Sequence, residues 1–310
     1  MARNFTWRDI LTIPRYRKQL VFLDTSLSLI YAPGVFSSVL HSLLNEGFRI
    51  STHSLTDQDT GDLIGQVCHS SHKTSARLAF VAPEKALSHE GMAKLLAHLC
   101  RQAGEMGALW VLAEVEEDTN LADHLQRVGF TPYTKQRIWR FPSGNLNSSN
   151  SLAWEPVSAR FLGEIHTLYQ KLIPSEVRRV EPPPTAADLL GLVCHREGEL
   201  VGYAAAHFGP KGLLLDILLD PTQNNHQAHI TAICQNLPTS RSQAVYIRVR
   251  AYQQKLETAL KDLKVSPSPA QMVMVKRLSA HYQVKQTFNL PTLEQQPDAS
   301  TPFVNLKSKS

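Results

Sequence analysis

The chain has few cysteines, and none is placed as a metal or redox motif requires. The four thiols form no C-x-x-C pair, and no leader with a basic start and a continuous apolar core precedes them, so we expect reduced cysteines in a cytoplasmic protein. Two of them lie in Cys-His dipeptides, but adjacent strand residues point to opposite faces, so we expect no metal site. These residues are Cys68, Cys100, Cys194 and Cys234, with His69 and His195.

Long apolar runs are also missing. The most apolar stretch, Leu20 to Leu44, is interrupted by Asp24, Pro33 and Gly34, whereas a membrane-spanning helix needs about 20 unbroken apolar residues. We therefore expect no membrane partner, and the stretch is typical of a pair of core helices.

A strong charge of one sign is missing as well. The formal net charge is +5 and the basic residues are scattered, so nucleic acid is not an expected partner. A nucleic-acid-associated module stays a weaker hypothesis, because it requires Lys and Arg gathered on one face.

What the chain does have is enough length for two domains. Its 310 residues suit two units of about 150 each. The stretch "FPSGNLNSSNSL" at the midpoint is rich in Ser, Asn and Gly, which is typical of a linker, and the last residues lack periodicity. The predicted division is a domain over 1–141, a linker over 142–152, a domain over 153–282 and a disordered tail over 283–310.

The two predicted domains resemble each other. "GDLIGQV" at Gly61 to Val67 corresponds to "GELVGYA" at Gly198 to Ala204, each a turn that leads into a strand. Six further positions match in register, which indicates a tandem duplication. They are Leu121, Leu125, Val128, Phe130, Pro132 and Gln136 in the first half and Leu256, Leu260, Leu263, Val265, Pro267 and Gln271 in the second.

Hydrophobic periodicity predicts an α/β fold with a mixed sheet. The apolar strands over 76–82 and 109–115 are joined by one helix, so they are expected to be parallel neighbours. The first half is predicted to contain helices over 7–19, 22–45, 91–105 and 119–128 and strands over 48–54, 62–69, 76–82, 109–115 and 135–141.

The helix over 91–105 starts with a polar run that has two interpretations. Its apolar residues recur at helical spacing, so one stripe packs on the sheet. Ser88 is a candidate N-cap and Gly107 a candidate end of the helix, which is how an ordinary helix is bounded. A helix N-terminus at the carboxyl end of a strand also suits a diphosphate, because its amides are unpaired and its dipole is positive.

Four segments in order resemble the GNAT superfamily of acyl-CoA-dependent N-acyltransferases: a strand ending "FVAP", a loop "SHEGMA", a strand "LWVLAEV" and then "DTNLADHLQRVGFTPY". The resemblance implies two tandem GNAT-like domains, with acetyl-CoA bound to the first as cosubstrate and no metal. The second half lacks glycine after Pro221, so we expect a degenerate unit there. The residues implied to bind the coenzyme are Phe80, Val81, Ser88, His89, Glu90, Gly91, Met92, Ala93, Lys94 and Asn120.

The resemblance leaves the catalytic residues unknown. The family commonly has a tyrosine where this chain has Leu125, and leucine donates no proton. Glu114 is a candidate general base through a water, and a solvated strand-end charge is the alternative. Tyr133 is a candidate proton donor, and a packed aromatic side chain is the alternative.

Two functional hypotheses follow. In the first, the N-terminal half transfers an acetyl group to a small-molecule or peptide amine, and the protein is a monomer or weak dimer. In the second, the duplicated fold is a non-catalytic binding or regulatory scaffold. Leu125 and the missing glycines favour the second hypothesis.

Overall fold

The computed structural model describes residues 2–4, 16, 18–31, 48–57, 61–141, 152–237 and 244–278. Most of the helix predicted over 7–19, nearly all of the predicted linker and the predicted tail lie outside these residues. So does the greater part of the helix pair predicted over 22–45.

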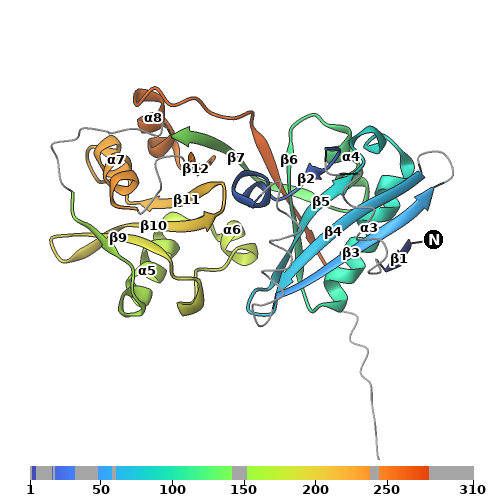
Figure 1. Cartoon of the computed structure of the whole chain (residues 1–310). Helices are drawn as coiled ribbons and strands as arrows, with labels where there is room; N and C mark the ends of the chain where they lie inside the picture. The colour runs from blue at the N-terminus through green and yellow to red at the C-terminus, as the bar shows by residue number, and fades with distance from the viewer. Residues whose placement is uncertain are drawn as a thin grey trace, which may run out of the picture. The chain divides into compact units, whose positions relative to one another are not determined.

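The first half has the predicted strands and helices from residue 48 onward, shown in Figure 1. The two strands predicted to be parallel, β5 and β6, are parallel neighbours. The elements of this half are β1 (Ala2–Asn4), β2 (Val21–Phe22), the π-helical turn η2 (Leu27–Tyr31), β3 (Phe48–Asp57), β4 (Gly61–Ser70), β5 (Ser75–Ala82), a 3-10 turn (Glu84–Ala86), α3 (Glu90–Glu105), β6 (Trp110–Glu116), α4 (Asn120–Arg127) and β7 (Thr131–Phe141).

The second half repeats this order of strands and helices. Its core elements β9 to β12, with α7 and α8, correspond to β3 to β6 with α3 and α4. The elements are β8 (Trp154–Pro156), a 3-10 turn (Ala159–Phe161), α5 (Leu162–Leu172), α6 (Ser175–Val180), a second 3-10 turn (Ala186–Asp188), β9 (Gly191–Arg196), β10 (Glu199–Gly209), β11 (Gly212–Leu219), α7 (His226–Asn236), β12 (Ala244–Arg250), α8 (Gln254–Asp262) and β13 (Gln271–Arg277).

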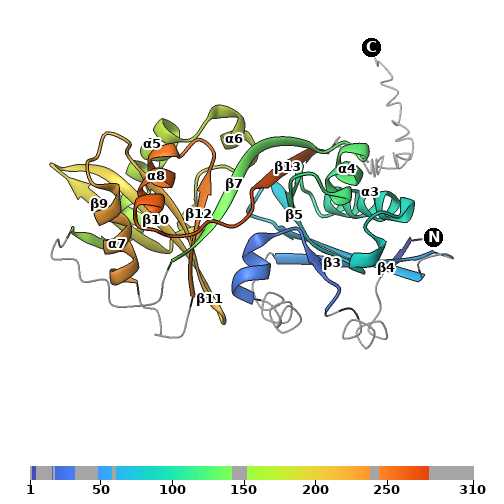
Figure 2. The same cartoon turned by 90° about the horizontal axis from the view of Figure 1, so that it is seen from above.

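One continuous sheet joins the two halves, because each half gives its last strand to the other. β13 lies between β6 and β7, and β7 pairs with β12, so the order through the centre is β5-β6-β13-β7-β12-β11. Figure 2 shows β7 running from the half that carries α3 toward the half that carries α8. The equivalent residues Gln136 and Gln271 face each other in the β7–β13 register. The predicted domain division stays a prediction, and this shared sheet crosses it.

The helix α3 packs as its periodicity predicts. Its apolar stripe is almost completely buried against the sheet, with every member no more than 2% exposed. Burial of each large side chain contributes about 2 kcal/mol of transfer free energy. The stripe consists of Met92, Leu95, Leu96, Leu99, Cys100 and Ala103.

Two local predictions are wrong. The N-cap of α3 is His89 rather than Ser88, because the Nδ1 atom of His89 accepts a hydrogen bond from the Gly91 amide. The predicted helix pair does not begin at residue 22, because Val21 and Phe22 form a strand on β5, and a single π-helical turn follows at Leu27–Tyr31. At its end, β5 has backbone groups on one side that no other strand satisfies. Pairing with these groups stabilises the segment more than a helix would, although its apolar pattern also fits a helix.

Candidate functional site

The strands β5 and β6 run together for three residue pairs and then separate. Their parallel register covers Ser75 to Arg77 on β5 and Trp110 to Leu112 on β6. Past these residues the two strands, both fully described, are not paired with each other. The divergence lies where the sequence resemblance implies the coenzyme site.

The chain itself fills this divergence with residues 19–25, which we call the inserted segment. The Leu23 amide donates to the Ala79 carbonyl on β5 at 2.9 Å, and the Leu23 carbonyl accepts from the Glu114 amide on β6 at 2.8 Å. Leu23 is 1% exposed. The segment therefore connects both strands as a short intervening strand, and water is excluded from the gap.

Pairing with the inserted segment extends to the end of β5. Val21 and Phe22 lie opposite Val81 and Phe80 in antiparallel register. Beyond the strand, the Glu84 amide donates to the Gln19 carbonyl at 2.9 Å. Both residues of β5 predicted to hold the coenzyme, Phe80 and Val81, are thus fully buried behind the chain's own backbone.

Three amides around the start of α3 also have partners within the chain. The His89 amide donates to the Ala86 carbonyl at 3.0 Å, the Met92 amide to the His89 carbonyl at 2.9 Å, and the Gly91 amide to His89 Nδ1 at 3.1 Å. A phosphate oxygen at this helix end would have to displace the His89 side chain, which already serves as the cap.

The other residues predicted to bind the coenzyme surround this helix start. The Glu90 carboxylate lies there and pairs with Arg127 at 2.9 Å on the surface. Ser88, Lys94 and Asn120 are exposed and Ala93 is half-buried. In this arrangement the described residues do not fit an acyl-CoA. The gap between β5 and β6 is filled by the inserted segment, and the N-terminus of α3 is capped by the chain's own His89 side chain.

Glu114 lies at the centre of a buried charge network rather than at a solvated strand end. Its side chain is 1% exposed, and its Oε1 atom accepts from Arg77 at 3.1 Å and from Arg248 at 3.4 Å. The Thr25 amide of the inserted segment donates to Oε2 at 2.9 Å. Burial acts to raise the pKa of Glu114, but the charges of Arg248, Arg77 and Arg250, with the Thr25 hydrogen bond, outweigh it and lower the pKa to about 2. A carboxylate held this strongly in its charged form is a weak proton acceptor at neutral pH.

Tyr133 belongs to the same network. Its hydroxyl donates a short hydrogen bond to the Glu181 carboxylate. Burial and the neighbouring Glu181 charge raise the pKa of Tyr133 well above its usual value of 10. The two candidate catalytic residues therefore come close together through shared partners, but each is committed to neighbours within the chain.

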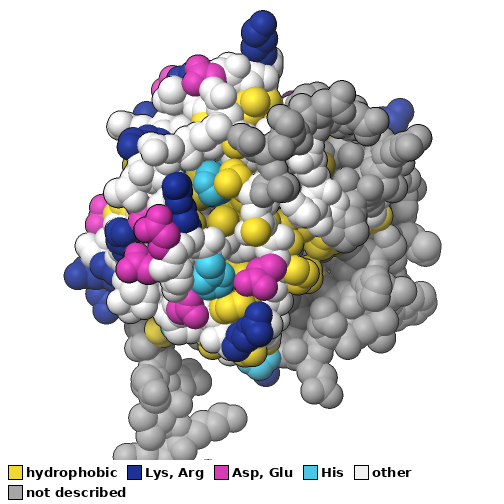
Figure 3. Space-filling view, turned by 90° about the vertical axis from the view of Figure 1, so that its left-hand side faces the viewer, with side chains coloured by type: hydrophobic (Ala, Val, Ile, Leu, Met, Phe, Trp, Pro, Cys, Tyr) yellow, Lys and Arg dark blue, Asp and Glu magenta, His cyan; other side chains and the backbone are white. Residues whose placement is uncertain are grey.

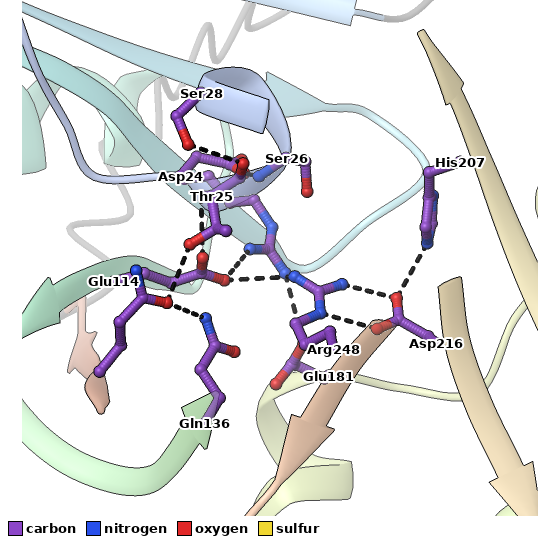
Figure 4. Close-up of polar contacts among 12 residues, drawn as sticks. Asp24, Thr25, Ser26, Ser28, Glu114, Gln136, Glu181, His207, Asp216 and Arg248 are labelled. Carbon is purple, nitrogen blue, oxygen red and sulfur yellow. Dashed lines mark hydrogen bonds and ion pairs between the residues drawn. The ribbon is translucent and has the colours of Figure 1, made fainter. Parts of the chain in front are cut away.

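Arginines and carboxylates from both halves complete the network, as Figure 4 shows. Arg248 binds Asp216 with two hydrogen bonds, at 2.7 and 2.6 Å. Arg77 reaches Glu181 at 3.3 Å, and Arg250 contacts both Glu181 oxygens at 3.0 Å. Glu181, from the second half, thus holds arginines from both halves, whereas Asp216 holds Arg248 of its own half.

Most residues of this network are not among those that the sequence singles out, although the sequence contains a signal for them. Isolated charged residues interrupt strands that are otherwise apolar, as in "ARLAFVAP", "LLLDILLDP" and "AVYIRVR". A charge in a buried strand requires a partner. The sequence does not say which charges meet, because the partners come from different strands and from the loop after α6.

A cavity of about 1020 Å³ lies beside the network. Residues of both halves line it, so neither half contains it alone. Its wall combines the charged groups with aromatic and aliphatic side chains. Among the lining residues are Asp24, Tyr31, Arg77, Tyr203, Asp216 and Arg248.

The inserted segment continues into η2, which contacts the second half at the rim of this cavity. The Ile30 carbonyl accepts from the Lys211 amide at 3.1 Å, and the Tyr31 hydroxyl donates to the Phe208 carbonyl at 3.1 Å. Gly209 permits this approach, because a Cβ there would lie 2.4 Å from the Ile30 carbonyl oxygen.

Comparisons with known proteins identify the fold. No protein-family model and no curated protein sequence matches the chain. Solved structures do match it over about nine tenths of its length. One is a tandem GNAT protein from the clavulanic acid biosynthesis pathway, with a TM-score of 0.54, 11% identity and coverage of 89% of this chain and 98% of that one.

The chain has the GNAT fold. Two further structures support this statement. A putative acetyltransferase from Pyrococcus horikoshii has a TM-score of 0.53 at 13% identity and covers 90% of each chain. A GCN5-related N-acetyltransferase from Sphaerobacter thermophilus has a TM-score of 0.52 at 11% identity, covering 89% of this chain and 95% of that one.

The second GNAT unit has its own strand divergence, which a side chain bridges. β11 and β12 pair as far as Asp216 and Arg248. Past that point the Gln253 amide nitrogen donates to the Ile217 carbonyl at 2.6 Å, and its oxygen accepts from the Arg250 amide at 2.9 Å. The strand gaps of both GNAT units are therefore crossed by groups of the chain itself.

The described part of the chain offers little to other classes of partner. It contains no group of three or more metal-ligating side chains, and none of its helices is long and apolar enough to cross a membrane. In Figure 3, which looks onto the second half, basic and acidic side chains are interspersed. The visible face does not gather Lys and Arg as a nucleic-acid surface would.

Proposed function

We propose that this protein is a GNAT-fold ligand-binding protein rather than an acetyl-CoA-dependent transferase, and that its ligand occupies the cavity between the two halves. One observation carries the proposal: Leu23 is hydrogen-bonded to both β5 and β6, so the inserted segment takes the gap that a coenzyme would need. The cavity supplies the binding volume, since ligand pockets range from about 300 to 1,000 Å³.

Opening the gap is energetically costly. It would expose the buried Leu23 side chain, at about 2 kcal/mol, and break several backbone hydrogen bonds at about 1 kcal/mol each. A cost of a few kcal/mol lowers the apparent affinity for any ligand that requires the open form by two or more orders of magnitude. Acetyl-CoA would have to offset this cost before it bound.

Acetyl-CoA-dependent transfer to an amine by the N-terminal half is the second candidate. The GNAT fold and the separation of β5 from β6 favour it. It requires the inserted segment to leave the gap, and it lacks a proton donor at Leu125, which is fully buried on α4. These two requirements make it the weaker candidate.

Acetyl-CoA binding decides between the two candidates. We expect no change of melting temperature at millimolar acetyl-CoA and no thiol release with a panel of amines and peptides. A ligand at a hundredfold excess over its Kd would stabilise the fold by about 2.7 kcal/mol, which is several degrees. A saturable shift that Gly91→Arg abolishes would overturn the proposal and support the N-terminal coenzyme site.

We further propose that the protein is a cytoplasmic monomer. Because β13 pairs with β6 and β7 pairs with β12 within one chain, these strands have no free edge that a second copy would need to cover. The four cysteines are free thiols, which suits a reducing compartment. Light scattering tests the monomer, and a concentration-dependent dimer mass would contradict it.

A further inference from the structure

We propose that the cavity binds an organic cation, including quaternary ammonium compounds that carry no transferable proton, and that Asp24 is the residue that pairs with it. The inference rests on the proposed function, because it assumes that the cavity is the ligand site. It adds the chemical class of the ligand and the residue that recognises it.

The charges around the cavity floor do not balance. The arginines Arg77, Arg248 and Arg250 find their ion pairs within 4 Å among Glu114, Glu181 and Asp216. Asp24 is a fourth carboxylate on the same floor, and none of the described residues forms an ion pair with it. The four carboxylates therefore carry one negative charge more than the three arginines neutralise.

Asp24 is buried, so a carboxylate charge that is only partly compensated there is costly. The residue is only 7% exposed, and its Oδ1 atom accepts one hydrogen bond, from the Ser26 amide at 2.9 Å. Its charge acts on its surroundings, because it raises the pKa of both Tyr31 and Arg77. Asp24 is the largest of the three carboxylate charges that raise the pKa of Arg77, ahead of Glu114 and Glu181. One arginine charge thus serves three carboxylates, and the charge of Asp24 is only partly compensated. A cation that entered the cavity would supply the pairing that a buried carboxylate requires.

Other basic groups on the cavity wall are already paired or reach solvent. Lys73 pairs with Asp188 at 3.3 Å, and His207 contacts Asp216 at 2.9 Å. His72 is exposed. None of these side chains forms an ion pair with Asp24.

Aromatic side chains in the cavity wall suit an apolar or aromatic body on the cation. Tyr203 is 3% exposed, and its hydroxyl has no hydrogen-bond partner within the described structure. Aromatic faces attract cations, quaternary ammonium groups in particular, by about 0.5–2 kcal/mol. The aromatic residues that line the cavity are Tyr31, Tyr169, Tyr203, Phe208 and Tyr252.

The inserted segment fixes Asp24 in place before any ligand arrives. Both backbone groups of the preceding Leu23 are hydrogen-bonded to the sheet, and the amide of the following Thr25 is held by Glu114. Asp24 is therefore anchored on both sides. A preorganised carboxylate loses little entropy when a cation binds, which favours affinity. The segment that closes the coenzyme gap thus also presents the carboxylate to the cavity.

The test uses four probes of similar shape and different charge on the full chain. They are phenethylammonium, benzyltrimethylammonium, neutral 2-phenylethanol and anionic 3-phenylpropanoate, titrated by calorimetry at pH 7. We expect both cations to bind about tenfold or more tightly than the alcohol, and the anion to bind most weakly, because a charged hydrogen bond or ion pair contributes more than a neutral contact.

Asp24→Asn removes the charge and keeps the side-chain oxygen that accepts from Ser26. We expect it to abolish the preference for cations over the alcohol while the alcohol still binds, which shows that the cavity is intact. Asp123→Asn, an exposed change of the same charge on α4, should leave all four affinities unchanged.

Either of two binding patterns would overturn the inference. One is an alcohol or anion that binds as tightly as the cations, and the other is a preference for cations that survives Asp24→Asn. A failure of all four probes at millimolar concentration would also overturn it, whereas acetyl-CoA turnover would overturn the proposed function, so the two failures are distinguishable.

Discussion

Replacing Glu114 with glutamine removes a charge from the network and leaves the shape of the side chain nearly unchanged. The carboxylate is 1% exposed and contacts Arg77 and Arg248. Lowering its pKa from 4.5 to about 2 corresponds to roughly 3 kcal/mol of stabilisation of the charged form. We therefore expect Glu114→Gln to lower the free energy of unfolding by about 3 kcal/mol at pH 7.

The pH dependence tests the cause of this loss. Because the pKa of Glu114 is lower in the folded state, its contribution is complete above about pH 5 and is lost as the pH falls toward 2. Chemical denaturation from pH 7 to pH 3 should show the gap between the wild type and Glu114→Gln narrowing below about pH 4.5, by about 1.4 kcal/mol per pH unit.

A matched variant separates burial from charge. Glu116 is exposed at the end of the same strand, so Glu116→Gln should change the unfolding free energy by less than about 0.5 kcal/mol. A loss below 1 kcal/mol for Glu114→Gln, or a gap that stays constant down to pH 3, would refute the assignment of Glu114 as the ion-paired centre of the network.

Three further predictions concern the halves of the chain and their contacts. The fragment 1–150 lacks β13, which lies between β6 and β7 in the full chain, so it should show no cooperative unfolding transition by circular dichroism. Mixing this fragment with the fragment 151–310 should restore a cooperative transition. Gly209→Ala should lower the melting temperature by several degrees, because its Cβ would lie 2.4 Å from the Ile30 carbonyl oxygen, and an unchanged value would contradict that contact. Burial raises the pKa of all four thiols, Cys68, Cys100, Cys194 and Cys234, so a thiol reagent at pH 8 should react slowly with the native protein and fast once it is unfolded. Rapid labelling of the native protein would argue against these raised pKa values.

The sequence predicts those features that local patterns determine. Helix α3 and strands β4, β5 and β6 follow their hydrophobic periodicity, and the duplication is visible in the matched positions that include Gln136 and Gln271. The GNAT fold, expected from four segments in order, is confirmed by the likeness to solved structures.

The role of residues 19–25 could not be predicted in the same way. The segment "QLVFLDT" has an apolar pattern that fits a helix as well as a strand. Its conformation is decided by the separation of β5 from β6, a tertiary feature that leaves backbone groups without partners until Leu23 satisfies them. The exchange of β7 and β13 is equally invisible, because each strand has the same pattern whichever half it pairs with.

The candidate site illustrates the same limit. The sequence offers Glu114 and Tyr133 as separate candidates for proton transfer, and the structure joins them through Arg77 and Glu181. The charged partners of both residues are far away in the sequence. The electrostatic environment of Glu114 and Tyr133 therefore follows from the fold and cannot be predicted from neighbouring residues. In the sequence, Asp24 stands out only as an interruption of an apolar run.

Hydrogen exchange of the Leu23 and Glu114 backbone amides, with and without millimolar acetyl-CoA, tests most directly whether the chain closes its own coenzyme gap. Our account predicts that both amides are strongly protected, because each donates to a buried carbonyl, and that the coenzyme leaves their exchange rates unchanged. Exchange as fast as in an open loop, or a loss of protection when acetyl-CoA is added, would contradict it.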